Sequence, residues 1–459
     1  MMLNEKQVIF VGNITQDTII TFEKDHHQHT PNGISSSQHH HIEQELNSDE
    51  DANSIHYQGY RKIVNKSLGG SVMFGCLAFQ HYMKNIDNQM YYSNNQHFKI
   101  HPKILTKIGK HDVMILSQFF NGLEHAANED DSITMVACES PIINKQFHKT
   151  FQPDLSEAKH LKRMKMFDMI LVEEDQSSKL TQYELLYPPF DSLENASNSR
   201  SLNCRDRGSI FKQDESINLM IRELHQVRAL LFVPVAAEFD HHFVNAFTNQ
   251  VFKEIQSDFL VCTDIQGYLR KIDTESGQVS HNTIEYLEEV LETLSKIISV
   301  IKLDHDEAKK CIPNSSEMTP EECAYHIQKN YGFPIVTVTM GSSGCVCACE
   351  GENIQLSLPR LRSNSSTPIV KYFSSYKPVR VLDETGAGDT FLSCFVAELL
   401  VRNSTANTSN KLSFSSEQVF ESVKLACSAT SFRVEQRGLN GFSTRIQAQQ
   451  RVNQQTVNM

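Results

Sequence analysis

The chain has 459 residues, and its 43 Lys and Arg residues against 55 Asp and Glu residues give a formal net charge of -12. This acidic balance, with no basic block to offset it, argues against nucleic acid or an anionic membrane as the main partner. No apolar run reaches about 18 residues, so we expect no membrane span. The short apolar run from Val8 to Val11 is followed by polar residues and does not resemble a signal peptide.

Hydrophobic residues make up 39% of the chain, which is low for a compact globule. The length allows two or three average domains, or one large α/β domain with insertions, and the low hydrophobic content indicates loop or disordered sequence that dilutes a normal core. The eleven cysteines are scattered through apolar segments without paired spacing. That distribution suits reduced thiols, and it predicts a cytoplasmic protein.

The N-terminal segment reads as a strand from Gln7 to Gly12, followed by Asp17 and a β-branched run from Thr18 to Phe22. A carboxylate just past a first parallel strand lies where α/β sheets bind ligands. A turn-capping aspartate is the alternative. Residues 23–59 are polar and histidine-rich, and we expect a disordered insertion because the histidine spacing fixes no metal geometry.

Ordered structure is predicted again from Tyr60 onward. Gly69 and Gly70 precede a helical pattern that runs to Met83, and glycines at such a place let backbone approach a ligand closely. Lys103 to Gly109 reads as a strand, and a turn from Gly109 to Asp112 follows it. Further strand candidates are 133–137 and 167–172, and polar insertions or loops are expected at about 121–165 and 191–220.

From residue 227 strands and helices alternate, which is typical of a parallel sheet. The expected strands are 229–235, 259–264 and 300–303, and the expected helices are 239–255 and 282–298. Asp304 and Glu307 follow the last of these strands and start a helix. Their spacing places both carboxylates on one helix face, where they could hold water-bound Mg²⁺ or form a capping box.

The segment from Pro334 to Cys349 reads as a strand, a glycine turn and a second strand, with Thr339, Gly341 and Gly344 at the turn. Three cysteines alternate along the second strand and share one face, so core packing is favoured over a metal or redox role. They are Cys345, Cys347 and Cys349.

A small-residue loop lies near the C-terminal end. Val381 and Leu382 read as a strand end, and Thr385 and Gly386 to Gly388 lead to Asp389 at the head of an amphipathic helix. Free backbone N–H groups and the helix dipole make such a turn an anion site, above all for phosphate. A carboxylate beside that site fits a general base that deprotonates an attacking hydroxyl. An αL turn with Asp389 as an ordinary N-cap is the alternative.

This loop resembles the C-terminal signature of the ribokinase/pfkB carbohydrate kinase family, with Glu384 as one departure. The family's other motifs appear in the family's order: Asp17, Gly69-Gly70, Gly109 to Asp112, Asp304 to Glu307, Thr339 to Gly344, and Thr385 to Asp389. Phe74 and Asp304 stand where the family often has asparagine. Leu68-Gly69-Gly70 with Phe74, and the turn from Asp264 to Arg270, are similar to the plant-type inositol kinase branch.

The resemblance implies a three-layer α/β/α fold around a mainly parallel sheet. Residues 1–442 would form the kinase domain, residues 18–22 and 60–68 a small β lid, and residues 443–459 a disordered tail. The implied reaction transfers the γ-phosphoryl group of ATP to a hydroxyl of a small polyol or sugar, with myo-inositol as the first candidate. A nucleoside or another sugar is the second candidate. An inactive pfkB-like binding protein is the alternative from another class.

The resemblance also implies roles for single residues. Gly386, Ala387 and Gly388 would form the anion hole and Asp389 would be the catalytic base. The implied binding residues are Asp17, Gly69 and Gly70 for the substrate, Thr339, Gly341, Gly344 and Thr385 for the nucleotide, and Asp304 and Glu307 for Mg²⁺. Several family members also use a monovalent cation such as K⁺. Val434 to Gly441 resembles the segment that closes over adenine.

Overall fold

The computed structural model describes residues 4–24, 60–84, 86, 98–106, 168–171, 180–186, 201–208, 210–211, 216–218, 220–221, 224, 227–254, 259–356, 367–406 and 412–456. The predicted turn at 109–112 and the strand candidate 133–137 lie outside these residues. Most of the histidine-rich segment 23–59 and all of 121–165 lie outside them as well.

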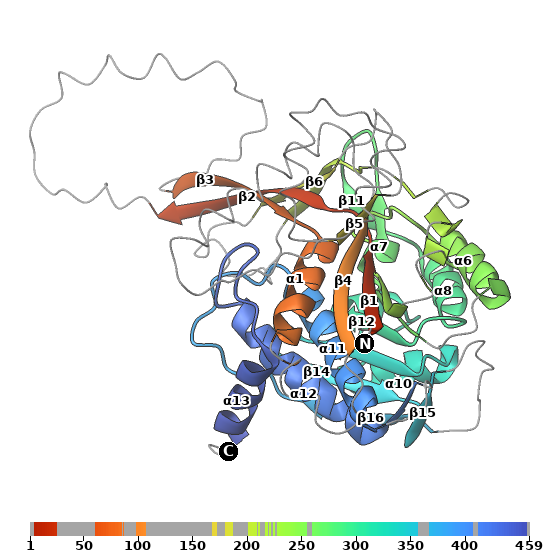
Figure 1. The fold of residues 1–459 in the computed structure, drawn as a ribbon. Helices are drawn as coiled ribbons and strands as arrows, with labels where there is room; N and C mark the ends of the chain where they lie inside the picture. Colours follow the sequence, from red (N-terminus) through yellow and green to blue (C-terminus); the bar gives the residue numbers. More distant parts are fainter. Residues whose placement is uncertain are drawn as a thin grey trace, which may run out of the picture.

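A large sheet forms the centre of the molecule (Figure 1), and its described strands follow the order β16-β14-β13-β12-β9-β8-β1-β4-β5. Neighbours pair in parallel from β5 to β13, whereas β14 pairs antiparallel with both β13 and β16. The strands are β1 Asn4–Val11, β4 Phe98–Thr106, β5 Asp168–Leu171, β8 Val227–Phe232, β9 Leu260–Asp264, β12 Val300–Asp304, β13 Ile335–Thr339, β14 Cys345–Cys349 and β16 Ile369–Phe373.

Helices cover both faces of this sheet. One layer contains α1 Ser71–Met83, α11 Ala387–Ala406, α12 Ser416–Arg433 and α13 Arg445–Thr456. The other contains α6 His241–Glu254, α8 Ile284–Leu294, α9 His305–Lys310 and α10 Pro320–Tyr331. Alternate residues of β1 enter different cores: Val8 and Phe10 pack with the α11 layer, and Ile9 and Val11 with the α6 layer. The expected three-layer α/β/α architecture is confirmed.

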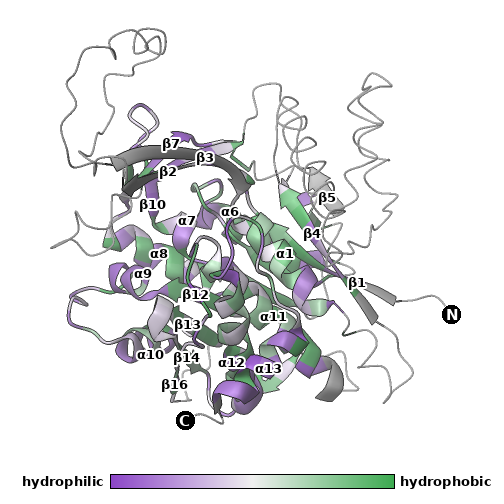
Figure 2. Cartoon of the chain, turned by 90° about the vertical axis from the view of Figure 1, so that its left-hand side faces the viewer, coloured by the Kyte–Doolittle hydropathy of each residue, from purple (hydrophilic) through white to green (hydrophobic). Residues whose placement is uncertain are grey.

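α11 is more deeply buried than its predicted amphipathic pattern indicates. Every residue from Thr390 to Val401 is buried, because α1 and α12 pack against α11 on either side. In Figure 2 much of α1 and α11 has hydrophobic colouring, whereas α10 is mostly hydrophilic. α11 is therefore a central helix of the fold rather than a surface helix.

A second sheet has the described strand order β3-β2-β6-β7 and extends away from the first (Figure 1). β2 Thr15–Lys24 pairs antiparallel with β3 Tyr60–Gly69, so the two predicted lid segments lie side by side. β6 Thr181–Leu186 and β7 Ser201–Asp206 complete it. The prediction of a loop at 191–220 is wrong over β7, because that segment gains hydrogen bonds from β6 that its polar sequence does not indicate.

The remaining described elements are short. They are α7 Gln266–Leu269, the hairpin strands β10 Arg270–Ile272 and β11 Val279–His281, the 3₁₀ turn η4 Gly341–Ser343, and the strands β15 Asn353–Gln355 and β17 Ser413–Ser415. Cys345, Cys347 and Cys349 all pack in the core with the α11 layer, as predicted. Within the described ranges, every helix is too short or too polar to span a bilayer.

Two predictions near the C-terminus are wrong. Val381 and Leu382 do not end a strand; the N–H groups of Leu382 and Asp383 donate to the Val434 carbonyl at 2.8 and 3.3 Å, after α12. The tail expected to be disordered contains α13. Arg445 of α13 makes a bidentate ion pair with the buried Glu398 of α11, at 2.6 and 2.8 Å. These tertiary contacts order a segment whose Gln- and Asn-rich composition suggested disorder.

Candidate active site

The loop from Asp383 to Asp389, here called the signature loop, leads into α11. Gly386 has φ 77°, and a Cβ placed there would lie 2.2 Å from the ring of Phe74. A Cβ on Gly388 would lie 2.8 Å from the Nζ atom of Lys302. Both glycines therefore allow other groups to approach the backbone at the helix start. Ala387 lies between these glycines in the predicted anion hole, and its N–H donates to the Glu384 carbonyl at 3.1 Å.

Asp389 is the third residue of α11, so it is not the N-cap of this helix. Its carboxylate accepts a hydrogen bond from Ser71 at the start of α1. Burial and the nearby Asp264 carboxylate raise the pKa of Asp389, and Ser71, Lys302 and Arg270 oppose that shift. A carboxylate with a raised pKa beside cationic groups is what a general base requires. The position and its electrostatics are therefore compatible with the predicted role.

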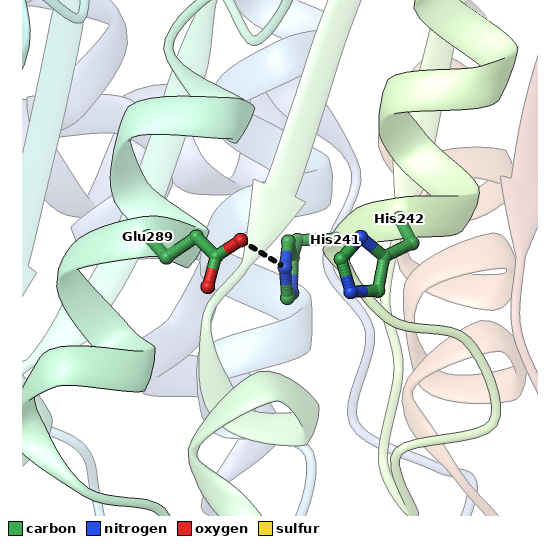
Figure 3. Close-up of side chains that lie close together, drawn as sticks. All are labelled: His241, His242 and Glu289. Atoms are coloured by element: carbon green, nitrogen blue, oxygen red, sulfur yellow. Dashed lines mark ion pairs between the residues drawn. The ribbon is translucent and has the colours of Figure 1, made fainter.

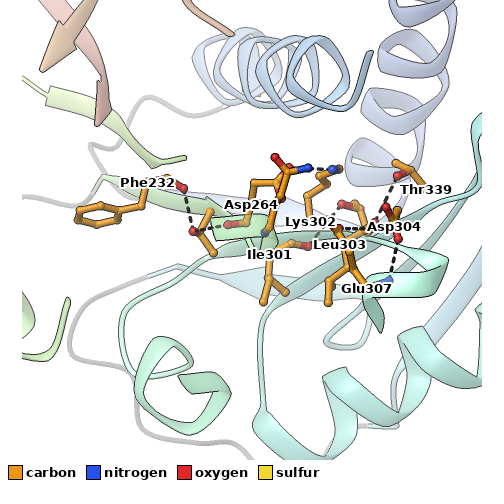
Figure 4. Close-up of polar contacts among 11 residues, drawn as sticks. Phe232, Asp264, Ile301, Lys302, Leu303, Asp304, Glu307 and Thr339 are labelled. Atoms are coloured by element: carbon orange, nitrogen blue, oxygen red, sulfur yellow. Dashed lines mark hydrogen bonds and ion pairs between the residues drawn. The ribbon is translucent and has the colours of Figure 1, made fainter. Parts of the chain in front are cut away.

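Lys302 and Asp264 are two charged residues that sequence reasoning missed. Both are buried, and Lys302 Nζ donates to Asp264 Oδ2 at 2.7 Å (Figure 4). Burial alone would lower the pKa of Lys302, but Asp264, Glu307 and Asp389 outweigh it and raise that pKa. Lys302 is thus a fixed positive charge next to Gly388. The signal in the sequence was a lysine inside an otherwise apolar strand, which rarely occurs without a buried partner.

Phe74 connects the predicted substrate-binding residues with the signature loop. A Cβ on Gly69 would lie 2.9 Å from Asp17 Oδ2 and 3.3 Å from the Phe74 ring, and Phe74 itself packs against Gly386. Gly70 has φ 88°, and a Cβ there would lie 2.9 Å from the Asn13 carbonyl. The second sheet therefore presents Asp17 beside Gly69, and Phe74 of α1 lies between Gly69 and Gly386.

Asp383 fixes the signature loop to the segment after α12. Its carboxylate accepts the N–H of Thr385 at 2.9 Å, the Arg433 guanidinium at 3.2 Å and the N–H of Gly438 at 3.1 Å. Burial would raise the pKa of Asp383, but the Thr385 hydrogen bonds and the Arg433 charge lower it. The Arg433 guanidinium also lies 5.0 Å from the centre of the Phe74 ring. The 434–441 segment and the signature loop are therefore neighbours.

Asp304 and Glu307 form a capping box at the start of α9. Asp304 Oδ1 accepts the Glu307 N–H and Glu307 Oε2 accepts the Asp304 N–H, both at 2.7 Å. Burial raises the pKa of Glu307 to about 7, although Lys302 opposes the shift. Each carboxylate has a second oxygen, and hard oxygen ligands suit Mg²⁺. The capping alternative is confirmed, and the metal role stays a prediction.

The glycine turn after β13 lies next to Asp304. Thr339 pairs in register with Asp304, and its hydroxyl donates to the Leu303 carbonyl at 3.3 Å. A Cβ on Gly344, with φ 104°, would lie 2.1 Å from the Phe373 carbonyl oxygen. No described residue has an atom within 4 Å of a Cβ on Gly341. Figure 4 shows Thr339, Asp304 and Lys302 close together at the carboxyl end of the sheet, where α/β folds bind ligands.

Comparison with known proteins agrees with this architecture. The profile of the pfkB family carbohydrate kinases matches residues 261–445. That range contains the signature loop, Asp304 and Glu307, but not Asp17, Gly69 or Gly70. No curated protein matches the chain by sequence.

Several solved structures resemble the chain in fold. Ribokinase from Giardia lamblia has a TM-score of 0.54 and 10% identity, with 99% of each chain covered. Ribokinase from Arabidopsis thaliana, solved with ribose and ATP, has a TM-score of 0.51 and 13% identity, covering 98% of this chain and 99% of the other. A pyrophosphate-dependent kinase of the ribokinase family, solved with a pyrophosphate analogue and myo-inositol, also has 0.51 and 13%, covering 96% and 99%.

The ribokinase-like fold and the resemblance to the ribokinase/pfkB family are thereby confirmed. At these identities the solved structures show the fold alone. The narrower assignment to the plant-type inositol kinase branch stays a prediction.

Proposed function

The chain carries a pfkB family carbohydrate kinase domain over residues 261–445, and from this premise we propose that it transfers the γ-phosphoryl group of ATP to a hydroxyl of a small polyol or sugar. The family is one of phosphotransferases with a hydroxyl acceptor. The observation that carries the finer proposal is the start of α11, where Asp389 lies beside Ser71 and Lys302.

Asp389 acts as the general base in this proposal. Its raised pKa makes the carboxylate a better proton acceptor than an ordinary aspartate, while Lys302 and Arg270 limit that rise. A substrate hydroxyl held against Asp389 would lose its proton as its oxygen attacks phosphorus. Ser71 fixes the carboxylate by donating a hydrogen bond to it.

The phosphoryl group would be held by backbone and by Lys302. The positive end of the α11 dipole and the N–H groups around Gly386 and Gly388 suit the spreading negative charge of phosphoryl transfer. The Lys302 ammonium group lies next to Gly388 and adds a positive charge to this anion site. Its hydrogen bond to Asp264 holds it in position. Mg²⁺ would neutralise charge on the nucleotide phosphates, with Asp304 and Glu307 as the residues that would hold its water shell.

Asp17 is the proposed anchor for the acceptor. Its buried carboxylate lies beside Gly69, on the same side of the molecule as Phe74 and Gly386, and can accept hydrogen bonds from two neighbouring hydroxyls. We take myo-inositol as the first substrate to test because Leu68-Gly69-Gly70 with Phe74 resembles the inositol kinase branch. A nucleoside or another sugar is the next choice. The segment 434–441, held by Asp383, would cover adenine.

The test is a donor and acceptor screen with purified full-length protein. Polyols, sugars and nucleosides are each offered with ATP, and phosphorylated product is identified by mass spectrometry. Pyrophosphate is run as a second donor, since a similarly folded kinase uses it. We expect turnover with ATP and a polyol, and loss of that turnover in Asp389→Asn.

Two outcomes would contradict the proposal. If no acceptor is phosphorylated above the level of Asp389→Asn while ATP still binds, the chain is an inactive binding protein. If turnover occurs and Asp389→Asn matches the parent, phosphoryl transfer is real but Asp389 is not the base.

A further inference from the structure

A cluster of two imidazoles and one carboxylate lies in the α6 layer, on the opposite side of the sheet from α11. His241 and His242 are the first two residues of α6, and Glu289 comes from α8 (Figure 3). One ligand atom from each side chain lies within 4.8 Å of the other two. None of these residues takes part in the proposed phosphoryl transfer.

The buried member of the cluster is His241. Its side chain is 3% exposed, and its Nδ1 and Nε2 atoms have no hydrogen-bond partner among the residues that the structure describes. A buried polar group without a partner is costly, because it has lost its contacts with water. Nε2 faces Glu289 Oε1 at 3.3 Å without forming a hydrogen bond. An additional group between these two atoms would remove that cost.

The geometry fits a small cation between the side chains. Ligand atoms on one tetrahedral zinc ion lie about 3.3 Å apart, since Zn–N and Zn–O bonds are about 2.0–2.2 Å. The separation of His241 Nε2 and Glu289 Oε1 already has this value. The His242 ring lies 4.0 Å from the His241 ring, and His242 and Glu289 are exposed enough to adjust their rotamers.

The surrounding charges also favour a cation. The carboxylates of Asp240 and Glu289 lie near Tyr286, which contacts His241. Asp240 caps α6 by accepting the Phe243 N–H at 2.9 Å, so its negative charge offsets the positive end of the helix dipole. Arg207 is the opposing positive charge at Tyr286.

We propose that His241, His242 and Glu289 bind one divalent transition-metal ion, with Zn²⁺ as the best match, and that the ion ties α6 to α8. Two neutral imidazoles and a carboxylate are ligands that zinc favours, and a water molecule would complete the tetrahedron. The role is structural, because Asp389 and Lys302 lie on the other face of the sheet. A simple ion pair between protonated His241 and Glu289 is the competing explanation, and it leaves His242 without a part.

The test is Zn²⁺ titration by calorimetry on the full-length, untagged chain after treatment with EDTA. Among the other histidines, a cluster of six at 26, 27, 29, 39, 40 and 41 could bind zinc independently. They are replaced by glutamine in the parent and in every variant. We expect one saturable site per chain and a rise in the thermal unfolding midpoint with Zn²⁺.

The informative variants are His242→Ala and Glu289→Gln, because both side chains are exposed and their loss should not unfold the chain. We expect each to weaken Zn²⁺ binding by at least about 10-fold and to remove the zinc-dependent rise in the unfolding midpoint. His326→Ala is the matched control, since His326 lies on α10 and contacts Asn330. It should bind Zn²⁺ as the parent does.

The proposal is overturned if the parent shows no saturable Zn²⁺ binding, or if either informative variant binds Zn²⁺ as tightly as the parent. Kinase activity is not the readout, so failure of the proposed function leaves this test unaffected.

Discussion

Two helix starts carry acids next to the same sheet edge, and they use them differently. At α9, Asp304 and Glu307 bond to each other's backbone N–H groups in a reciprocal capping box. At α11, Asp389 makes no such cap; its carboxylate is held by the side chain of Ser71 from another helix. Both helix starts lie near Lys302. Burial alone would lower the pKa of Lys302, but Asp264, Glu307 and Asp389 raise it.

The comparison distinguishes acidic residues that stabilise the start of a helix from an acidic residue that is proposed to act in catalysis. A capping acid stabilises its own helix, so helix formation alone is enough to explain it. Asp389 lies in the first turn of α11, has a raised pKa and is held by a side chain of another helix rather than by its own backbone. At α11 these features support the proposed role of Asp389 as a base, while at α9 the proposed metal role must be shown in addition to capping.

The largest expected effect is on turnover after Asp389→Asn. General-base catalysis contributes about 10²–10⁴-fold, so kcat should fall by about that factor. The protein should be at least as stable as the parent at neutral pH, because burial and Asp264 already oppose ionisation of Asp389. Coupled ATP turnover and urea unfolding measure the two quantities. An unchanged kcat would remove the distinction between α11 and α9.

A second prediction concerns the space at Gly386. In Gly386→Ala the new Cβ would meet Phe74 at 2.2 Å on a residue with φ 77°. Backbone strain and overpacking together should lower the free energy of unfolding by about 2–4 kcal/mol. Gly438→Ala is the matched control, with φ 63° and no atom of the described part of the chain within 4 Å of the Cβ.

Strain alone should cost Gly438→Ala about 1–2 kcal/mol. Urea unfolding of both variants compares them. Equal losses would show that Phe74 moves away freely and that the packing around the signature loop is not tight.

At α9, Asp304→Ala should lower the free energy of unfolding by about 1 kcal/mol through loss of the cap. Asp304→Asn keeps a good capping residue and should cost less than about 0.5 kcal/mol. The Mg²⁺ concentration for half-maximal activity then tests the metal role. If it rises in Asp304→Asn, Asp304 serves Mg²⁺ as well as the cap; if neither variant changes it, capping is its only task.

The smallest expected effect is a shift of the pH profile. Asp389 must be ionised to act as a base and its pKa is raised from 3.8, so kcat/KM should fall on the acid side at a higher pH than an ordinary aspartate gives. Asp264 contributes to that raised pKa. Asp264→Asn should therefore move the acid limb to lower pH, and a limb that moves upward would contradict the assigned electrostatics.

Much of the fold was predictable because parallel strands covered on both faces are continuous apolar runs. The predicted strand at 259–264 and the observed β9 Leu260–Asp264 almost coincide, as do 300–303 and β12 Val300–Asp304. Helix 239–255 corresponds to α6 His241–Glu254. Polar segments that depend on partners were missed. β7 is held by β6, and α13 by the ion pair of Arg445 with Glu398.

The candidate site was predictable in part. Gly386, Gly388 and Asp389 are contiguous, so their chemistry can be read from one turn. Lys302 and Asp264 are 38 positions apart and belong to separate strands. Their pairing depends on the register between β9 and β12, which places Asp264 opposite Lys302. No local pattern carries that information.

The sequence by itself determined the α/β class, the glycine turn at α11 and the acid that follows it, because those features depend on neighbouring residues. Tertiary structure decided that the Phe74 ring packs between Gly69 and Gly386 and that the Lys302 ammonium group lies next to Gly388. It also decided that Asp304 and Glu307 cap α9 while Asp389 does not cap α11. Helix and strand periodicity is local, whereas the electrostatics of a buried charge depend on partners that only folding brings within a few ångströms.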